Sequence, residues 1–272
     1  MSRAYSLAAL TVLELTPPEM VRCAAEAGYS HVGIRLLPAT PTEPQYDLVG
    51  DTPLLREVLR RLADTGVQVL DAEIFRLKPE TVVADCEPAI ATAARLGASE
   101  LLVAGNDPDE ARLTERFAVL CELAARYRLG ANLEFMSWTD AKNLTQAARI
   151  VAAAGQPNGA VLIDAFHLSR SGSRIADIAA MPAHHLRYLQ LGDVPAAMPA
   201  TEAEVLAEAR AERRFPGDGG LDLVGLLRAV PATLPISLEV PTATLAKTVG
   251  AVERARRALA AAKRVVATAE AV

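Results

Sequence analysis

The stretch SLAALTVLELTPPEMVRCAAEAGYSHVGIRLL, residues 6–37, indicates the fold class. It opens with an apolar run at 6–10 and closes with a second apolar run at 31–37. The segment between them has the ends of a helix, because Thr16 can cap it, two prolines suit its first turn, and Gly28 can stop it. A strand, a helix and a strand in this order predict one βαβ unit of a parallel sheet.

The same alternation continues to the end of the chain. Eight apolar runs are predicted to be strands, at 6–10, 31–37, 67–75, 99–105, 131–136, 159–166, 186–193 and 236–240. They are apolar almost without interruption, as strands are when protein covers both faces of a parallel sheet. Eight such units in 272 residues predict an α/β protein with a single (β/α)8 TIM barrel, one domain over residues 1–272.

Other local features follow from the positions of glycine and proline. Further helices are expected to end at Gly66, Gly97 and Gly130. Two segments are expected to be irregular, residues 38–51 and residues 194–221, and both follow the C-terminal ends of strands. A long helix rich in alanine and arginine is expected from about residue 244 to the C-terminus.

Composition restricts the classes of partner. The formal net charge of −5 argues against nucleic acid and anionic membranes, because most of the surface would repel them. No signal peptide is recognisable, and no apolar run approaches the roughly 18 residues that span a bilayer. The cysteines, Cys23, Cys86 and Cys121, lack metal-binding spacing and are expected in helices in a reducing compartment. We therefore expect a cytoplasmic protein, and a homo-oligomer stays open.

Four polar residues interrupt the last four apolar runs near their C-terminal ends. They are Glu134, Asp164, Gln190 and Glu239. A polar side chain in an apolar strand costs several kcal/mol unless it is paired or binds a metal. Inward side chains at equal height on consecutive barrel strands converge on the axis, so the four are expected to meet at one point.

A shared divalent cation is the interpretation that explains this set best. Three carboxylates in close contact would repel each other, and a cation removes the repulsion. Carboxylate and amide oxygens suit Mg²⁺ or Mn²⁺, whereas zinc more often recruits histidine or cysteine. The alternative is that each carboxylate pairs with its own arginine or caps a helix.

Two further residues are expected to touch a substrate. His167, alone among the four histidines, lies at the C-terminal end of a strand, where it can act as an acid, a base or a hydrogen-bond donor. Arg214 precedes the turn FPGDGGLD and can hold a substrate oxygen. A histidine that merely supports the site is the alternative for His167. A surface ion pair is the alternative for both Arg213 and Arg214, and it suits Arg213 better.

Three more positions are candidates for the same pocket. Arg76 ends the third strand and can bind a substrate carboxylate or phosphate, although an ordinary ion pair explains it nearly as well. Asp193 ends the seventh strand and can orient a metal ligand or contact substrate. Trp138 follows Glu134 by four residues and can form a wall of the pocket, or can serve packing alone.

These residues resemble a known family. The matching segments are Glu134, LIDAFH at 162–167, YLQLGD at 188–193, RRFPGDGGLD at 213–222 and SLEVP at 237–241. Together they resemble the xylose isomerase-like barrels, also called sugar phosphate isomerases/epimerases. The resemblance covers the whole chain in architecture, and its specific motifs lie between Glu134 and Pro241.

The resemblance implies a metal site and a substrate site. In this family Glu, Asp, His or Gln, and Glu on strands five to eight bind one Mn²⁺, Mg²⁺ or Co²⁺, which here implies the four residues named above. The histidine and arginine that match His167 and Arg214 contact substrate oxygens in relatives. Gln190 stands where many epimerases have histidine, and it is similar to the 3-dehydroshikimate and inosose dehydratase branches. The combination of Glu134 and Trp138 is similar to the 3-dehydroshikimate dehydratases. This likeness implies that Arg76 receives a substrate carboxylate.

Three functions remain open at this stage. The first is a metal-dependent isomerase or epimerase that acts on a small hydroxy-carbonyl or polyol substrate through an enediolate, with Glu134 and Glu239 moving the proton. The second is a dehydratase that shares this first step and then loses a hydroxyl group. The third is a barrel that binds metal without catalysis. The DNA-repair endonucleases of the superfamily have a histidine-rich site for three metals, which this sequence lacks.

Overall fold

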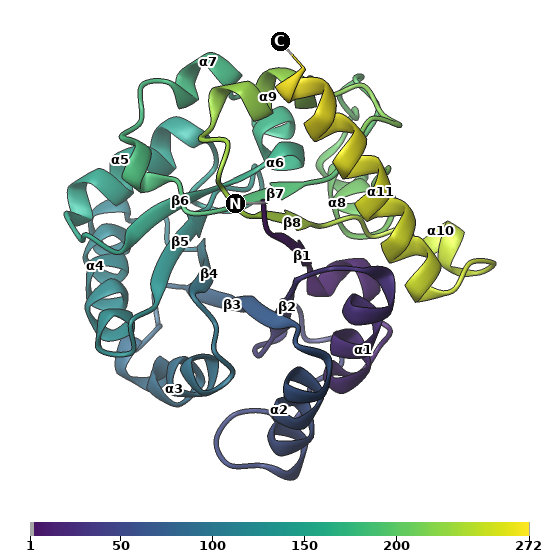
Figure 1. The fold of residues 1–272 in the computed structure, drawn as a ribbon. Helices are drawn as coiled ribbons and strands as arrows, with labels where there is room; N and C mark the ends of the chain where they lie inside the picture. The colour runs from purple at the N-terminus through teal and green to yellow at the C-terminus, as the bar shows by residue number, and fades with distance from the viewer. Residues whose placement is uncertain (1–2, 272) are drawn as a thin grey trace.

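Eight parallel strands close into a barrel in the order in which they follow one another along the chain (Figure 1). The computed structural model describes residues 3–271. The strands are β1 (Tyr5–Leu7), β2 (His31–Arg35), β3 (Gln68–Leu77), β4 (Glu100–Gly105), β5 (Gly130–Glu134), β6 (Gly159–Asp164), β7 (Leu189–Leu191) and β8 (Ile236–Leu238). Pairing of β8 with β1 closes the sheet, and the predicted TIM barrel is confirmed.

Helices surround the barrel on the outside (Figure 1). The α-helices are α1 (Pro17–Ala27), α2 (Pro53–Thr65), α3 (Glu87–Arg95), α4 (Glu110–Arg126), α5 (Leu144–Ala154), α6 (Ala165–Arg170), α7 (Ile175–Ile178), α8 (Glu202–Ala211), α9 (Leu223–Ala229), α10 (Ala243–Ala246) and α11 (Ala251–Glu270). Short 3-10 helices lie at η1 (Ala9–Val12), η2 (Val83–Cys86) and η3 (Ala183–His185).

The ends of the first helix follow the sequence rules. Thr16 and Glu19 form a capping box at the start of α1, and Gly28 ends the helix with a left-handed φ of 90°. Gly66 and Gly97 have positive φ values after α2 and α3. These three helix ends are as predicted.

The predicted stop at Gly130 is wrong. Helix α4 ends at Arg126, and Arg128 takes the positive φ, 61°. Gly130 instead begins β5, where a Cβ atom would lie 2.1 Å from Oε2 of Glu100. The glycine is needed for this close approach to the Glu100 side chain inside the barrel.

Two predictions for the last third of the chain also need correction. Helix α8 lies inside the segment 194–221 that was expected to be irregular. It starts with a capping box of Thr201 and Glu204, but only Val205 and Ala209 are buried, so its apolar period is weak. The C-terminal helix does not run unbroken from residue 244, because α10 ends at Ala246 and α11 starts at Ala251.

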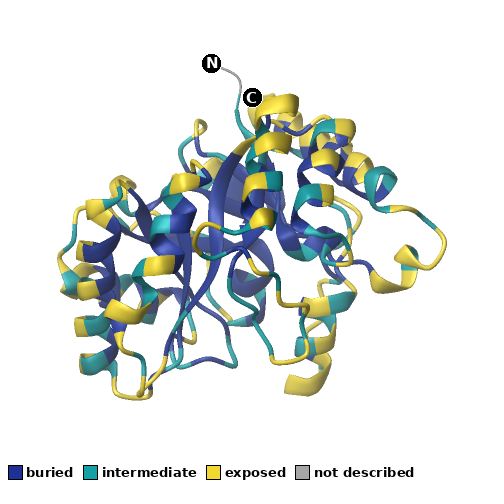
Figure 2. Ribbon diagram, turned by 90° about the horizontal axis from the view of Figure 1, so that it is seen from below, coloured by how far each residue is buried: buried dark blue, intermediate teal, exposed yellow. Residues whose placement is uncertain are grey.

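Burial is concentrated on the strands (Figure 2). The main apolar core lies between the strands and the outer helices. A smaller apolar cluster fills part of the barrel interior and consists of Leu70, Ile74, Leu102, Ala104, Met136, Leu162 and Tyr188. Cys23 and Cys121 are buried, and Cys86 is partly buried. Within residues 3–271, no helix is long and apolar enough to cross a bilayer.

Candidate active site

The strands bring the four expected metal ligands to one end of the barrel. Glu134 and Asp164 are the last residues of β5 and β6, Gln190 is the middle residue of β7, and Glu239 directly follows β8. Asp164 pairs in register with Gln190. All four side chains are buried, with at most 5% of each residue exposed. Parallel strands end on one side, so their C-terminal residues share the mouth of the barrel.

Three of the side chains at this mouth have the spacing of metal ligands. One ligand atom from each of Glu134, Asp164 and His167 lies within 4.8 Å of the others. His167 Nε2 lies 3.7 Å from Oε1 of Glu134 and 3.9 Å from Oδ2 of Asp164. Asp164 also caps α6, since its Oδ1 accepts the Phe166 N–H at 2.7 Å, and this cap holds His167 on the first turn.

Arg213 connects Asp164 to Glu239, the remaining acidic residue of the site. Its Nη1 lies 2.7 Å from Oδ2 of Asp164, and its Nη2 lies 2.7 Å from Oε2 of Glu239. The guanidinium also stacks over Phe166, 4.6 Å from the ring centroid. One arginine therefore contacts two expected metal ligands, and its ion pairs are buried, unlike the surface ion pair that was the alternative for Arg213.

Burial shifts the pKa values of the groups in the site. Burial and the charges of Glu239 and Asp164 raise the pKa of Glu134 well above its usual range. Burial also raises the pKa of Glu239 to about 8, although Arg213 opposes the shift. Burial is the largest single influence on Asp164 and would raise its pKa, but Arg213, His167 and the Phe166 N–H together lower that pKa. Burial lowers the pKa of His167 to about 4, so the imidazole is neutral at pH 7.

The donor set fits a divalent cation. The amide oxygen and nitrogen of Gln190 are buried without a hydrogen-bond partner in the described part of the chain. Glu134 and Glu239 have raised pKa values because burial and neighbouring negative charge disfavour their ionised forms. A cation among these oxygens would relieve both costs. The metal assignment itself stays a prediction.

A narrow cavity of about 60 Å³ opens onto this group. Its walls include Glu134, His167, Glu239 and Arg213, whereas Asp164 and Gln190 do not line it. Arg35 also lines the cavity, but its guanidinium forms ion pairs with two carboxylates. Its Nη2 lies 2.7 Å from Glu73, and its Nη1 lies 2.9 Å from Glu43.

Two other arginines line the same cavity, and neither has its charge matched by a carboxylate in the described chain. Arg76 donates one hydrogen bond, from Nη1 to Oδ1 of Asn106 at 2.9 Å, and its buried Nε has no partner among residues 3–271. Arg210, on α8, is exposed, and no ion pair to it occurs in the described chain. Trp138 forms part of the wall, with its ring centroid 5.1 Å from that of His167.

Two of the expected substrate contacts lie elsewhere. The Asp193 carboxylate accepts N–H groups from Val194, Gly217, Gly219 and Leu221 at 2.8–3.1 Å. It thus shapes the turn that follows Arg213. The side chain of Arg214 is exposed and donates to the Asp218 carbonyl oxygen at 3.3 Å. Neither residue lines the cavity.

Arg35 and Glu73 are residues of this site that the sequence reasoning missed. Both are charged residues inside apolar strands, the same signal that identified the four expected ligands. They lie in β2 and β3, outside the last four strands that hold the expected ligands. Arg210 gave no such signal, because charged residues are ordinary on an exposed helix.

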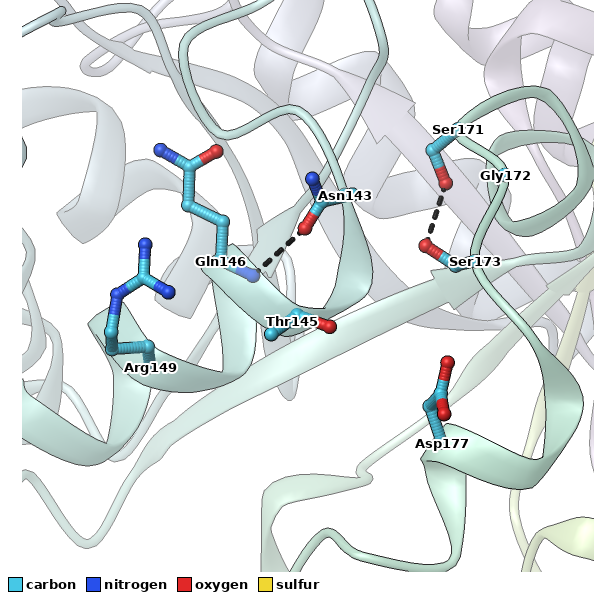
Figure 3. A pocket seen from close by; sticks show the side chains of 8 residues that line it. All are labelled: Asn143, Thr145, Gln146, Arg149, Ser171, Gly172, Ser173 and Asp177. Carbon is cyan, nitrogen blue, oxygen red and sulfur yellow. Dashed lines mark hydrogen bonds between the residues drawn. The ribbon is translucent and has the colours of Figure 1, made fainter.

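A larger, open pocket of about 530 Å³ lies outside the barrel, between α5 and the segment that joins α6 to α7 (Figure 3). Its polar groups are engaged locally. Asn143 caps α5 through the Gln146 N–H, and Ser171 hydrogen-bonds to Ser173. Arg149 pairs with Glu110. None of the expected site residues lies in this pocket.

Known proteins resemble the chain in sequence and in fold. The family model described as xylose isomerase-like TIM barrel matches residues 21–265. A 3-dehydroshikimate dehydratase of Pseudomonas aeruginosa is 30% identical over 241 residues, which cover 83% of this chain and 36% of the relative. The chain thus spans about a third of the length of this relative.

Solved structures share the fold at lower sequence identity. A xylose isomerase-like TIM barrel/4-hydroxyphenylpyruvate dioxygenase fusion protein superposes with a TM-score of 0.79 at 24% identity, over 96% of this chain and 42% of that one. The IolI protein with a bound zinc atom superposes with a TM-score of 0.78 at 17% identity, over 97% and 98% of the two chains.

Proposed function

The chain belongs to the xylose isomerase-like TIM-barrel family, and on that premise we propose that it is a divalent-metal-dependent dehydratase of a small, acidic hydroxy-carbonyl compound. The observation that carries the proposal is the gathering of Glu134, Asp164, His167 and Glu239 at the mouth of the barrel, beside arginines with unpaired donors. The 30% identity to a 3-dehydroshikimate dehydratase supports dehydration over the other reactions of the family.

The metal would be held by Glu134, Asp164, Gln190 and Glu239, with His167 close enough to join them. The oxygen-rich set favours Mn²⁺ or Mg²⁺, with Co²⁺ as a further candidate. Bound there, the cation would polarise the substrate carbonyl and stabilise negative charge on its oxygen. The cation would weaken the ion pairs of Arg213 with Asp164 and Glu239. The guanidinium charge would then be available to a substrate oxygen.

The positions of the carboxyls divide their roles. Glu134 and Glu239 face the cavity, so either can remove the proton from the carbon beside the carbonyl. Asp164 and Gln190 do not line the cavity, so their role would be to hold the metal in place. In dehydration the carboxylate takes that proton, a carbon–carbon double bond forms, and the hydroxyl on the next carbon leaves as water after gaining a proton.

Charge at the cavity favours an acidic substrate. The positive charges of Arg35 and Arg213 are already matched by buried carboxylates, whereas Arg76 and Arg210 keep free donors. A substrate carboxylate can take two parallel hydrogen bonds from such a guanidinium. 3-Dehydroshikimate, the compound in the relative's name, is a carboxylic acid of this kind.

Epimerisation or isomerisation is the second candidate. The observation in its favour is that two carboxyls, Glu134 and Glu239, face one cavity and can serve opposite faces of a planar intermediate. Return of the proton to the other face gives an epimer, and return to the neighbouring carbon gives an isomer. A barrel that binds metal without catalysis would show neither reaction.

The test is incubation of the protein with 3-dehydroshikimate and Mn²⁺, with absorbance followed in the aromatic region. A new absorbance that disappears with a chelator and with Glu239→Gln, but survives in the surface variant Glu115→Gln, supports the dehydratase. Exchange of a substrate C–H for deuterium from solvent without that absorbance, on ketoses or polyols, supports the epimerase. If no substrate reacts or exchanges, catalysis at this site is ruled out for these classes.

A further inference from the structure

A second polar layer lies inside the barrel, directly beneath the candidate metal centre. Asp71, Asn132 and Tyr188 each stand two residues before a residue at the mouth, namely Glu73, Glu134 and Gln190. Side chains two apart on a strand point to the same face, so these three point into the barrel one step further from the mouth. Ser6 of β1 completes the layer, since layers of a TIM barrel take one side chain from each alternate strand.

Every residue of this layer has at least one side-chain oxygen without a hydrogen-bond partner among the described residues. All four residues are 0% exposed. The atoms without a hydrogen bond are Oγ of Ser6, both carboxylate oxygens of Asp71, Oδ1 of Asn132 and the hydroxyl of Tyr188. Branched apolar side chains are the usual filling of such a layer. Each unsatisfied buried group costs about 1–3 kcal/mol, so a ligand that hydrogen-bonds to these atoms would stabilise the layer.

The orientation of Asn132 indicates which kind of ligand is needed. Its Nδ2 donates to Oε2 of Glu100 at 2.9 Å and to the carbonyl of Leu101 at 3.2 Å. Its Oδ1 is therefore left as an acceptor. Asp71 also offers acceptors, and it has no ion-pair partner in the described chain, in contrast to Glu73, which has Arg35. The layer needs a ligand that donates hydrogen bonds.

The barrel wall beside Asp71 carries no side chain at Gly33. Gly33 of β2 faces this carboxylate, and a Cβ atom there would lie 3.0 Å from Oδ1 of Asp71 and 3.1 Å from Oε1 of Glu73. A side chain at this position would crowd both acids. Burial, with the charge of Glu73 added, raises the pKa of Asp71 well above its usual range.

Backbone register connects the layer to Gln190. Ser237 of β8 pairs in register with Gln190 on one side and with Ser6 on the other, and its Oγ has no partner either. If Oε1 of Gln190 binds the metal, its Nε2 needs an acceptor. Buried oxygens without partners are found in the polar layer and at Ser237.

We propose that the layer of Ser6, Asp71, Asn132 and Tyr188 is an internal water-binding site that fixes the amide of Gln190. Water held by Asp71 and its neighbours accepts the Nε2–H of Gln190, so that Oε1 points to the metal. Asp71 is thus a positioning residue. The role for Gln190 rests on the proposed metal centre, whereas the water site itself does not. A water typically makes about three hydrogen bonds in such sites, which the layer can supply.

The first test is a high-resolution crystal structure of the intact protein, grown with and without Mn²⁺. The expected result is electron density within hydrogen-bonding distance of Asp71 and of at least two of Ser6, Asn132 and Tyr188, present with or without Mn²⁺. A dry layer whose side chains bond directly to each other overturns the proposal. So does an anomalous peak at this place after a rubidium soak, because it would identify a cation site.

The second test measures Mn²⁺ affinity by calorimetry in Asp71→Asn and Asp71→Leu. Asn can still bind water and should keep most of the affinity, whereas Leu should weaken binding about 10- to 100-fold, the range for lost partners of metal ligands. Equal affinity in Asp71→Leu and the unchanged protein overturns the positioning role. Should Asp71→Leu fail to fold, Tyr188→Phe removes one hydroxyl at constant shape and should weaken Mn²⁺ in the same direction.

The two proposals fail in different ways. Absence of Mn²⁺, Mg²⁺ and Co²⁺ binding in the unchanged protein, with Glu239→Gln no different, rejects the metal centre while the crystal structure still decides the water site. If Mn²⁺ binds tightly, with the same affinity in Asp71→Leu, Tyr188→Phe and the unchanged protein, the positioning role is rejected. The proposal of a metal centre is then unaffected.

Discussion

The Nη1 of Arg213 lies 2.7 Å from Oδ2 of Asp164 in the interior of the barrel mouth, where both side chains are almost fully buried. The same guanidinium reaches Glu239. A metal held by these carboxylates must share them with an arginine. Several expectations follow from this competition and from the surrounding contacts.

Replacement of Arg213 by Gln should separate binding from catalysis. Without the competing charge, Mn²⁺ should bind about tenfold more tightly, equivalent to about 1.4 kcal/mol. The metal-free protein should lose about 3–5 kcal/mol of unfolding free energy, because two buried carboxylates lose their partner. Calorimetry and urea denaturation measure these changes, with Arg126→Gln on the outer face of α4 as the control. Weaker Mn²⁺ binding in Arg213→Gln would show that the arginine organises the ligands instead.

Metal binding should strengthen as pH rises toward 8. The pKa of Glu239 is raised to about 8, so in the metal-free protein a proton occupies this carboxyl at neutral pH and must leave when metal binds. Calorimetry in buffers of different ionisation enthalpy should therefore detect proton release at pH 7 and less of it at pH 9. Proton release that is the same at both pH values would contradict the assignment of Glu239.

The same shift has a consequence for stability. A carboxyl whose folded pKa is raised stabilises the folded state fully below its unfolded pKa, near 4.5, and this contribution is lost as pH rises through the folded value of about 8. The melting temperature of the metal-free protein should thus fall between pH 5 and 8. Added Mn²⁺ should restore more stability at pH 8 than at pH 6. A larger restoration at pH 6 would argue against a metal bound by these carboxyls.

Arg76→Ala and Arg210→Ala should affect substrate binding. If these arginines receive a substrate carboxylate, KM for acidic substrates should rise about tenfold or more in each variant, while neutral polyols and ketoses should be unaffected. Steady-state kinetics on a matched pair, the acid and its methyl ester, gives the comparison. An unchanged KM in Arg76→Ala would remove this residue from the site.

Asp193→Asn should act on the turn that follows Arg213. The carboxylate accepts four backbone N–H groups, and an amide cannot accept all of them. The unfolding free energy should fall by about 2 kcal/mol, within the range for hydrogen bonds to a charged group. If Asp193 contacted substrate instead, KM would change while stability did not. Thermal unfolding and kinetics on one preparation distinguish the two outcomes.

The barrel could be predicted from sequence because its signal is repeated eight times. Each apolar run is short, but the helix caps at Thr16 and Gly28 and their equivalents mark where the period changes. Errors occurred where a local signal was weak. Helix α8 has little apolar period, and Gly130 stands inside a strand because of a neighbour distant in sequence, Glu100.

The expected metal ligands lie at one end of the barrel because strand direction alone brings the ends of parallel strands together, and their role as ligands stays a prediction. The choice between Arg213 and Arg214 could not be made in the same way. Neighbouring residues of an extended segment point to opposite sides, so one of the pair had to face inward. Which one it is depends on the pairing of Arg214 with Asp193, a contact between segments that the sequence does not display.

The course of α11 places the C-terminal end of the described chain close to its N-terminal end. Near its end this helix passes the start of β1, since Nζ of Lys263 lies 5.7 Å from the ring centroid of Tyr5 and the Ala269 carbonyl accepts from Arg228. Both ends of the described chain therefore emerge at the floor of the barrel, on the side away from the mouth. A bead, a reporter or an electrode linked to either end would leave the entrance open to small molecules.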